Sequence, residues 1–392
     1  MSQQQINLSS DLKLLLDEGY DVEIRYGHLL LKNIPYVNSK REIKYGILIS
    51  HLTVDGGDTP IKPADHVAYF AGENPCNREG AEISQIKHSS PGTRIGKDLT
   101  LDHMFSGKLI NASYGSFYEK MTTYIAIISG PAQAIDPTVK ANTHPVIESR
   151  EEESVFRYMD SASTRIQINV IAEKLASSKI AIVGLGGTGS YVLDLVAKTC
   201  VKEIHLYDGD KFSQHNAFRS PGAMSIQTLA RKLQKVNLFE EVYSAMRRGV
   251  IQHNYYVDAS NVHELRGMNF VFLCLDNGPS RKLLVEKLQE FDIDFVDVGM
   301  GVYQIDDFLA GHVRTTASTK AQQMSAKTKI PFTDDANNEY SRNIQIVDLN
   351  ALNAALAVIK WKKIFGFYSD LDNEHHSVYT IDGNALDNED QT

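Results

Sequence analysis

Cysteine is scarce in this 392-residue chain, and its three cysteines, Cys76, Cys200 and Cys274, lie far apart. None of them belongs to a C-x-x-C pair. A disulfide framework needs an even set of closely spaced cysteines, and a thiolate zinc site typically needs C-x-x-C pairs. The sequence therefore predicts neither a disulfide-stapled scaffold nor a structural zinc ion.

Long apolar runs and an excess of basic residues are also missing. The run at residues 270–275 is among the longest, whereas a membrane-spanning helix needs about 20 apolar residues. The amino-terminal residues lack the basic and apolar segments of a secretory signal. Lys and Arg number 40 against 49 Asp and Glu, which disfavours a nucleic acid or an anionic membrane as a partner. We expect a cytoplasmic protein.

The acidic residues are unevenly distributed along the chain. Seven acids and no Lys or Arg lie between residues 370 and 390, so the rest of the chain is close to neutral. We interpret residues 370–392 as an acidic, solvated carboxyl-terminal tail. The apolar content of 42% and the length of 392 residues are typical of a globular protein with two domains.

The first 145 residues predict a smaller, β-rich α+β domain. A helical pattern covers residues 11–16, and short strand-like runs follow, separated by loops with glycine and proline. These runs cover residues 22–25, 28–31, 45–51 and 123–128. Two prolines and a cluster of charges between residues 136 and 153 have the composition of a linker. We therefore place the domain boundary at residue 145.

Residues 146–369 predict a Rossmann-like α/β domain with a mostly parallel sheet. Short apolar runs alternate with helical patterns, which indicates strands covered by helices on both faces. The expected strands cover residues 180–183, 203–207, 270–275 and 295–298, and the expected helices cover residues 152–175, 190–200, 280–290 and 343–365.

A glycine-rich turn follows the first of these strands. Gly184, Gly186, Gly187 and Gly189 form a G-x-G-x-x-G motif where a helix is expected to begin. The N-terminus of such a helix offers unpaired N–H groups and a partial positive charge to phosphate. Asp208 lies 19 residues beyond Gly189, at the end of the next strand, where an acid can bind ribose hydroxyls. The glycine motif and Asp208 together predict a nucleotide site.

Residues beyond Asp208 favour ATP over a nicotinamide dinucleotide. Asn216 and Arg219 fall within one short turn, and the planar guanidinium of arginine suits phosphate oxygens. Asp276 and Asn277 directly follow the apolar run at 270–275. That position is the carboxyl edge of the sheet, where ligands of α/β proteins bind and where Asp276 can hold the magnesium ion of a triphosphate.

Three segments together resemble the ThiF/MoeB/ubiquitin-activating (E1-like) superfamily. They are KIAIVGLGGTGS, YDGDKFSQHNAFR and CLDN, in the family's order, between residue 157 and about residue 365. The resemblance implies ATP-dependent adenylation of the carboxyl-terminal carboxylate of a ubiquitin-like protein, with release of pyrophosphate. It also implies that the four glycines and Asn277 lie close to the nucleotide, that Asp208 binds ribose, and that Asn216 and Arg219 contact phosphates. Asp276 serves Mg²⁺ and the reacting phosphate.

The resemblance implies two further cations. One is a lysine downstream of the arginine, for which Lys235 matches the family in local sequence while Lys232 fits its usual distance better. We prefer Lys235. The other is an arginine donated across a dimer interface, for which Arg157 and Arg165 both have a suitable position before the glycine strand. We select Arg165, and a homodimer follows as an expectation.

The chain departs from many relatives in the region that would carry an acyl-accepting cysteine. No cysteine follows Cys274, and residues 311–319 carry hydroxyls instead, including Thr315 and Thr316. We interpret this segment as a polar loop. Either the reaction stops at the acyl adenylate and a separate carrier attacks it, or one of the two hydroxyls is the acyl acceptor. The first reading is favoured, because a hydroxyl is a much weaker nucleophile than a thiolate.

The first domain is interpreted as a recognition module for the ubiquitin-like protein or a conjugating-enzyme-like carrier. It resembles N-terminal extensions of bacterial family members that accompany ubiquitin-like conjugation genes, which implies a bacterial pathway of that kind, with an antiviral role. Residues 71–77 read as an exposed turn, so that Cys76 is a candidate nucleophile of a fused conjugating module. Two other functions stay open, an NAD-dependent oxidoreductase and a non-catalytic ATP-binding scaffold.

Overall fold

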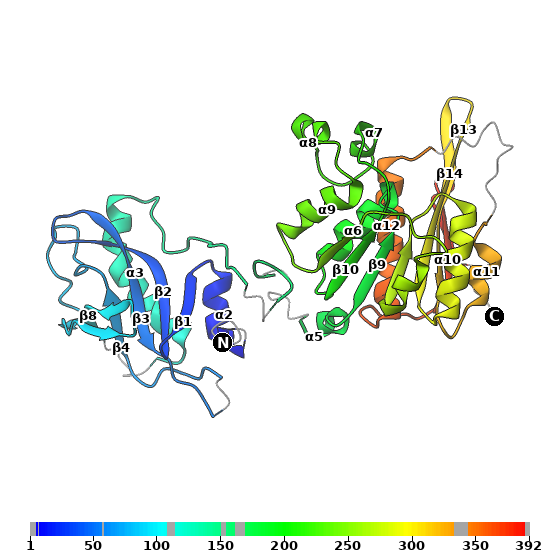
Figure 1. The fold of residues 1–392 in the computed structure, drawn as a ribbon. Helices are drawn as coiled ribbons and strands as arrows, with labels where there is room; N and C mark the ends of the chain where they lie inside the picture. The colour runs from blue at the N-terminus through cyan, green and yellow to red at the C-terminus, as the bar shows by residue number, and fades with distance from the viewer. Residues whose placement is uncertain are drawn as a thin grey trace. The chain divides into compact units, whose positions relative to one another are not determined.

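A computed structural model describes residues 5–6, 8–56, 59–107, 114–149, 154–160, 169–332 and 344–388 (Figure 1). The chain divides into two compact units, residues 1–147 and residues 148–392. In the part of the chain that the structure describes, no helix combines the length and the apolar character needed to cross a bilayer.

In its described residues, the first unit is an antiparallel sheet with helices α2 and α3. The six-stranded sheet has the order β1-β2-β3-β4-β8-β5, and β6 and β7 form a separate two-stranded ribbon. Helix α2 begins after Ser9, whose side chain caps it by accepting a hydrogen bond from the N–H of Leu12. The elements are α2 (Ser10–Asp17), β1 (Asp21–Arg25), β2 (His28–Val37), β3 (Ile43–His51), β4 (Val67–Ala71), β5 (Lys87–Ser89), β6 (Thr93–Ile95), β7 (Leu99–Leu101), β8 (His103–Ser106) and α3 (Phe117–Ile135).

Residues 123–128 were expected to form a strand, and that prediction is wrong. They lie inside helix α3, whose buried positions include Phe117, Met121, Tyr124 and Ile128. These positions recur at steps of three and four, which is the period of a helix. A short apolar run by itself does not distinguish a strand from a buried helix, and the longer pattern decides.

The second unit contains an eight-stranded sheet of order β11-β10-β9-β12-β13-β14-β15-β16. The first five strands are parallel to one another, and the last three are added antiparallel. This topology, with the separate antiparallel first unit, confirms the predicted fold class. The strands are β9 (Lys179–Val183), β10 (Glu203–Tyr207), β11 (Val250–His253), β12 (Phe270–Leu273), β13 (Phe295–Ile305), β14 (Phe308–Ser318), β15 (His376–Thr380) and β16 (Ala385–Asn388).

Helices cover both faces of this sheet. On β9, Ile180 and Ile182 pack into one core cluster, and Ala181 and Val183 into the other, because successive side chains of a strand point to opposite faces. The first face carries α6 (Gly187–Ala197), α9 (Lys235–Ser244) and α12 (Val347–Ile364), and the second carries η2 (Val262–Gly267), α10 (Gly278–Glu290) and α11 (Met324–Lys329). The remaining short helices are α5 (Asn169–Ala172), η1 (Glu173–Leu175), α7 (Gln214–Ala217) and α8 (Ile226–Ala230).

Of the helix expected over residues 152–175, the described residues 154–160 are not helical, whereas residues 169–175 are. The backbone of Phe156 forms a β-bridge with Arg247, and the Arg248 guanidinium donates hydrogen bonds to the carbonyls of Ser154 and Phe156 at 3.1 and 2.8 Å. The backbone groups of Ser154 and Phe156 are therefore paired with residues 247–248 and not with one another in the hydrogen-bond pattern of a helix. Where the described chain resumes, residues Asn169–Ala172 form helix α5.

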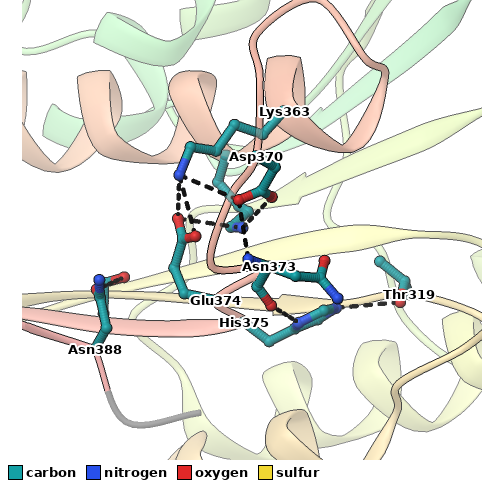
Figure 2. A network of polar contacts seen from close by, with 9 residues as sticks. Thr319, Lys363, Asp370, Asn373, Glu374, His375 and Asn388 are labelled. Atoms are coloured by element: carbon teal, nitrogen blue, oxygen red, sulfur yellow. Dashed lines mark hydrogen bonds and ion pairs between the residues drawn. The ribbon is translucent and has the colours of Figure 1, made fainter. Parts of the chain in front are cut away.

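Residues 370–388 are not the solvated tail that their acidity suggested. Asp370 and Glu374 form ion pairs of 2.8 to 3.4 Å with Lys360 and Lys363 from the end of α12. Figure 2 shows Lys363 reaching both carboxylates, just before β15 joins the sheet. Strands β15 and β16 then extend the sheet beyond β14. The negative charges of Asp370 and Glu374 are thus balanced by lysines of helix α12, and not by basic residues within the segment itself.

Candidate functional site

The glycine-rich turn joins β9 to the N-terminus of α6. Gly184 has a φ of +91°, and a Cβ there would lie 2.4 Å from the carbonyl oxygen of Cys274. A Cβ on Gly189 would lie 1.9 Å from the carbonyl oxygen of Gly184, whereas one on Gly186 would meet no atom within 4 Å. Gly184 and Gly189 are thus required by the packing of the protein itself. Gly186 faces open space, as a backbone approached by a nucleotide would.

Asp208 lies at the end of β10, beside this turn, and is almost fully buried. Its carboxylate accepts hydrogen bonds from the backbone N–H of Leu185 at 2.7 Å and of Asp210 at 2.8 Å. The first bond ties the carboxylate to the glycine turn, and the second ties it to the loop that follows β10. Its orientation is therefore set by the backbone.

Lys235, the first residue of α9, lies against this carboxylate. Its Nζ is 3.2 Å from Asp208 Oδ2 and 2.8 Å from Asp210 Oδ2, and its side chain is buried. Backbone hydrogen bonds between residues 210–212 and 233–235 bring it there. Lys232 is exposed and has a positive φ of 49°. The structure thus brings Lys235, and not Lys232, to the acidic pair.

Asp210 and Tyr256 belong to the same cluster, and the sequence analysis missed both. The Tyr256 hydroxyl donates a hydrogen bond to Asp210, which raises the pKa of Tyr256 to about 12. Burial opposes ionisation of Asp210, but hydrogen bonds from Lys235 and Tyr256 hold its pKa below the usual value. Asp210 stands two residues beyond Asp208, which is a signal that could have been used. Tyr256 has no such local signal.

Asn216 and Arg219 lie on and directly after helix α7. The Asn216 side chain accepts a hydrogen bond from the N–H of Ser213 at 2.8 Å, and its carbonyl accepts one from the N–H of Arg219 at 3.1 Å. Asn216 therefore shapes the turn that carries Arg219. The Nε of Arg219 is buried and has no hydrogen-bond partner in the described part of the chain. A buried donor of this kind calls for an acceptor, and an anion would supply one.

Asp276 and Asn277 follow β12 at the carboxyl edge of the sheet, and both side chains are exposed. Asn277 caps helix α10 by accepting a hydrogen bond from the N–H of Ser280 at 2.8 Å, so its oxygen already has a structural role. The negative charges of Asp208 and Asp276 both help to raise the pKa of Tyr256. The two carboxylates therefore act on the same phenol and lie on one side of the fold.

This set of groups fits a magnesium–triphosphate complex. Among the described residues, no group of three His, Cys, Asp or Glu side chains could hold a metal ion by protein ligands alone. Mg²⁺ is commonly bound by one or two carboxylates together with substrate phosphates. Asp276 is an exposed carboxylate at the carboxyl edge of the sheet, where a phosphate would bind. Arg219, Lys235 and the N-terminus of α6 are groups whose positive charge would suit the phosphates.

Each of the two parts of the chain matches a known protein family. Residues 165–305 match the ThiF family, and residues 10–161 match a domain of unknown function, DUF6791. The chain contains a ThiF-family domain. Ubiquitin-like modifier-activating enzyme 5 of Culex quinquefasciatus is 23% identical over 164 residues, which cover 36% of this chain and 38% of that protein. The chain thus matches less than two fifths of that relative's length.

Solved structures similar to this chain include Escherichia coli MccB and PaaA. Escherichia coli MccB is 15% identical, with a TM-score of 0.46, and the match covers 56% of this chain and 64% of that one. A further structure of MccB is described with ATP. PaaA is 16% identical, with a TM-score of 0.43, and the match covers 56% of this chain and 66% of that one.

Of the two arginines expected to serve a partner subunit, the structure describes Arg157. Arg157 donates from its side chain to the carbonyl of Ser244, at the end of α9 opposite to Lys235. Ten residues of helix separate the two ends, which is about 14 Å. Arg165, the preferred position, lies outside the described residues.

Thr315 and Thr316 of the ThiF-family domain are buried, and the polar loop expected there is strand β14. Thr316 Oγ1 accepts a hydrogen bond from Arg314 at 2.6 Å and lies 2.9 Å from Nδ1 of His376. Strand β14 is paired on both sides, with β13 and β15, and threonine suits such a strand. Neither hydroxyl is accessible to an acyl group in this structure.

The three cysteines are equally unsuited to nucleophilic attack. Cys76, expected in an exposed turn, is buried, and its backbone forms bridges with Val37 and Glu82. Burial raises the pKa of the thiols of Cys76, Cys200 and Cys274. A thiol with a raised pKa is a poor source of thiolate.

Proposed function

We propose that this chain is an ATP-dependent adenylyltransferase that activates the carboxyl-terminal carboxylate of a ubiquitin-like protein and releases pyrophosphate. One observation carries the proposal: Lys235 and the turn before α6 both meet the Asp208 carboxylate at the carboxyl edge of the sheet. Arg219 adds a buried Nε that has no partner among the described residues. The ThiF-family match supports the reaction class, and the name of the Culex relative supports the substrate class.

Neutralisation of charge is the main chemical task of such a site. A carboxylate attacks the α-phosphate, which is an anion, and pyrophosphate leaves with more negative charge. Lys235 has three N–H donors, of which two meet Asp208 and Asp210, so the third can meet a phosphate. Arg219 offers its unpaired Nε. Because these cations are held in place before the reaction, they stabilise the developing charge without reorganisation.

The acidic groups of the site have separate tasks in this proposal. The Asp208 carboxylate accepts hydrogen bonds from two backbone N–H groups and from Lys235. Its remaining lone pairs can accept hydrogen bonds from the ribose hydroxyls. Asp276 would hold Mg²⁺, which when bound screens the phosphate charges. No general base is needed for this step, because a carboxylate is already ionised at neutral pH.

The fate of the activated acyl group follows from the buried nucleophiles. The three thiols have raised pKa values, and the hydroxyls of Thr315 and Thr316 are buried in β14. The proposal is therefore that the acyl adenylate is attacked by a nucleophile of a separate carrier. We further propose that residues 1–145 recognise this carrier or the ubiquitin-like protein, in a homodimer that serves a bacterial conjugation pathway with an antiviral role.

The test is ATP–pyrophosphate exchange with Mg²⁺ and a panel of ubiquitin-like proteins that have free carboxyl termini. Arg219→Ala should lower exchange by about 100- to 1000-fold, as expected when one preorganised charge is removed. Arg231→Ala is the matched control, because this arginine is half-exposed and pairs with Glu241; its exchange rate should equal that of the wild type.

Other outcomes would identify the competing functions. Enhanced NADH fluorescence on mixing, without ATP binding, would indicate an oxidoreductase. Bound ATP without exchange, and unchanged partner binding in Arg219→Ala, would indicate a scaffold. Mass spectrometry with and without hydroxylamine then separates a free adenylate from an ester on the chain.

A further inference from the structure

Asn350, in the first turn of helix α12, packs behind the glycine-rich turn. Helix α12 lies along α6 although the two are far apart in the sequence (Figure 1). The Asn350 side chain is 1% exposed, and its amide atoms lie 2.3 to 2.5 Å from the position that a Cβ on Gly187 would occupy. Gly187 therefore lacks a side chain because Asn350 fills that space, which is a different reason from close approach to a nucleotide.

The same amide holds the next residue of α6. Thr188 Oγ1 donates a hydrogen bond to Asn350 Oδ1 at 2.9 Å. The Nδ2 of Asn350 is buried and has no partner in the described part of the chain. An apolar side chain of similar size would fill the space without leaving a donor unpaired, so packing alone does not account for an amide at this position.

Gly187 and Thr188 are the first two residues of α6. The first intrahelical hydrogen bond of this helix is donated by Ser190 to Gly186, at 3.1 Å, so the N–H groups before Ser190 have no acceptor within the helix. These are the groups that a phosphate would meet. Asn350 contacts Gly187 and Thr188, which carry the first two of these N–H groups.

We propose that Asn350 is a positioning residue for the triphosphate. It acts through Gly187 and Thr188, by keeping the first turn of α6 where its N–H groups can bind phosphate. The inference rests on the proposed function. It assigns a role in nucleotide binding to the carboxyl-terminal helix α12, which contributes none of the residues described above as nucleotide contacts.

Asn353 provides a matched control one turn further along α12. It is also buried, but its amide donates to the carbonyl of Gly299 at 2.9 Å and accepts from Thr315 at 3.4 Å, so these two partners lie on β13 and β14. If Asn350 has only a structural role, alanine at either position should have the same effect on ATP affinity.

The experiment measures the dissociation constant of Mg²⁺–ATP for the full chain by equilibrium titration. Asn350→Ala should weaken binding about tenfold, as expected for the loss of one well-placed hydrogen bond, whereas Asn353→Ala should stay within about twofold of the wild type. Thr188→Val removes the same hydrogen bond from the other side and should reproduce the effect. The double variant Asn350→Ala with Thr188→Val should be no weaker than either single variant, because coupled residues are not additive.

The outcomes separate this inference from the proposed function. A wild-type chain that does not bind ATP overturns the proposed function. A wild-type chain that binds ATP, with unchanged binding by Asn350→Ala or an equal loss in Asn353→Ala, overturns only the role of Asn350. If Asn350→Ala does not fold, Thr188→Val carries the test alone, and ATP binding equal to that of the wild type then contradicts the inference.

Discussion

Lys235 and Asp208 form a buried ion pair, with Nζ 3.2 Å from Oδ2 and exposed fractions of 6% and 5%. The two residues meet because the loop after β10 pairs with the residues before α9, as the β-bridge between Lys211 and Gln234 shows. The lysine is thus largely removed from water and oriented by carboxylates. A phosphate that enters the site meets a cation that is already in place.

Replacing Lys235 by methionine should destabilise the ThiF-family domain by about 3 kcal/mol, because removal of one partner leaves the Asp208 charge buried and unpaired. Lys232→Met is the control, and it should change stability by less than about 0.5 kcal/mol, since that side chain is exposed. The single tryptophan, Trp361, is buried in the core of this domain. Its fluorescence in urea therefore reports unfolding of the domain.

The same pair of variants decides which lysine serves the nucleotide. ATP binding should be weakened in Lys235→Met and unchanged in Lys232→Met. A loss confined to Lys232→Met would show that the family's usual spacing, and not the ion pair with Asp208, identifies the phosphate lysine.

Gly186 and Gly189 should respond differently to alanine. A Cβ on Gly189 would lie 1.9 Å from a backbone oxygen, whereas one on Gly186 would meet nothing within 4 Å. Gly189→Ala should therefore destabilise the domain by at least about 1 to 3 kcal/mol, seen as a lower urea midpoint. Gly186→Ala should keep the wild-type midpoint and bind ATP more weakly. Equal midpoints for the two variants would contradict this assignment.

Thr316→Val should lower stability without abolishing activity. The substitution removes a hydroxyl that is bonded to Arg314 and His376 inside the sheet, which costs about 1 to 3 kcal/mol when the partners are left unpaired. Pyrophosphate exchange should continue at the wild-type rate under conditions where the variant is folded. A hydroxylamine-sensitive ester on Thr315 or Thr316, detected by mass spectrometry, would contradict the prediction.

The ion network of Asp370 predicts a loss of stability in acid. Burial opposes ionisation of Asp370, but Lys360 and Lys363 outweigh it and hold the pKa of Asp370 below its ordinary value of 3.8. A carboxyl with a lower pKa in the folded state stabilises the fold above its ordinary pKa, and the contribution is lost as the pH falls through the lower, folded value. Wild-type stability should therefore fall from about pH 5 downward.

Asp370→Asn should show a shallower fall over the same pH range, measured by Trp361 fluorescence in urea. Asp372→Asn removes an exposed acid from the same loop and should keep the wild-type profile. Identical profiles for all three proteins would mean that the network does not stabilise the carboxyl-terminal strands.

Much of the candidate site was predictable because its residues follow strands locally. Gly184, Asp208 and Asp276 each come after a short apolar run, and the carboxyl ends of parallel strands meet at one edge of a sheet. The choice between Lys232 and Lys235 was not predictable in this way. It depends on a backbone pairing between two loops, which no local pattern in the sequence specifies.

The errors of the sequence analysis have the same origin. Residues 123–128, the segment with Thr315 and the acids after Asp370 were interpreted from their immediate neighbours. Their states depend on distant partners: the sheet on which α3 packs, the strand β15 that covers β14, and the lysines at the end of α12.

The sequence by itself determined that this protein has an α/β domain of the ThiF family, since the motifs and strand pattern are local properties of the chain. Only the tertiary structure decided which lysine meets Asp208, that the candidate acyl-accepting hydroxyls are buried, and that the acidic carboxyl-terminal residues complete the sheet. The physical reason is that burial and charge pairing depend on segments distant in sequence, which come together only when the chain folds.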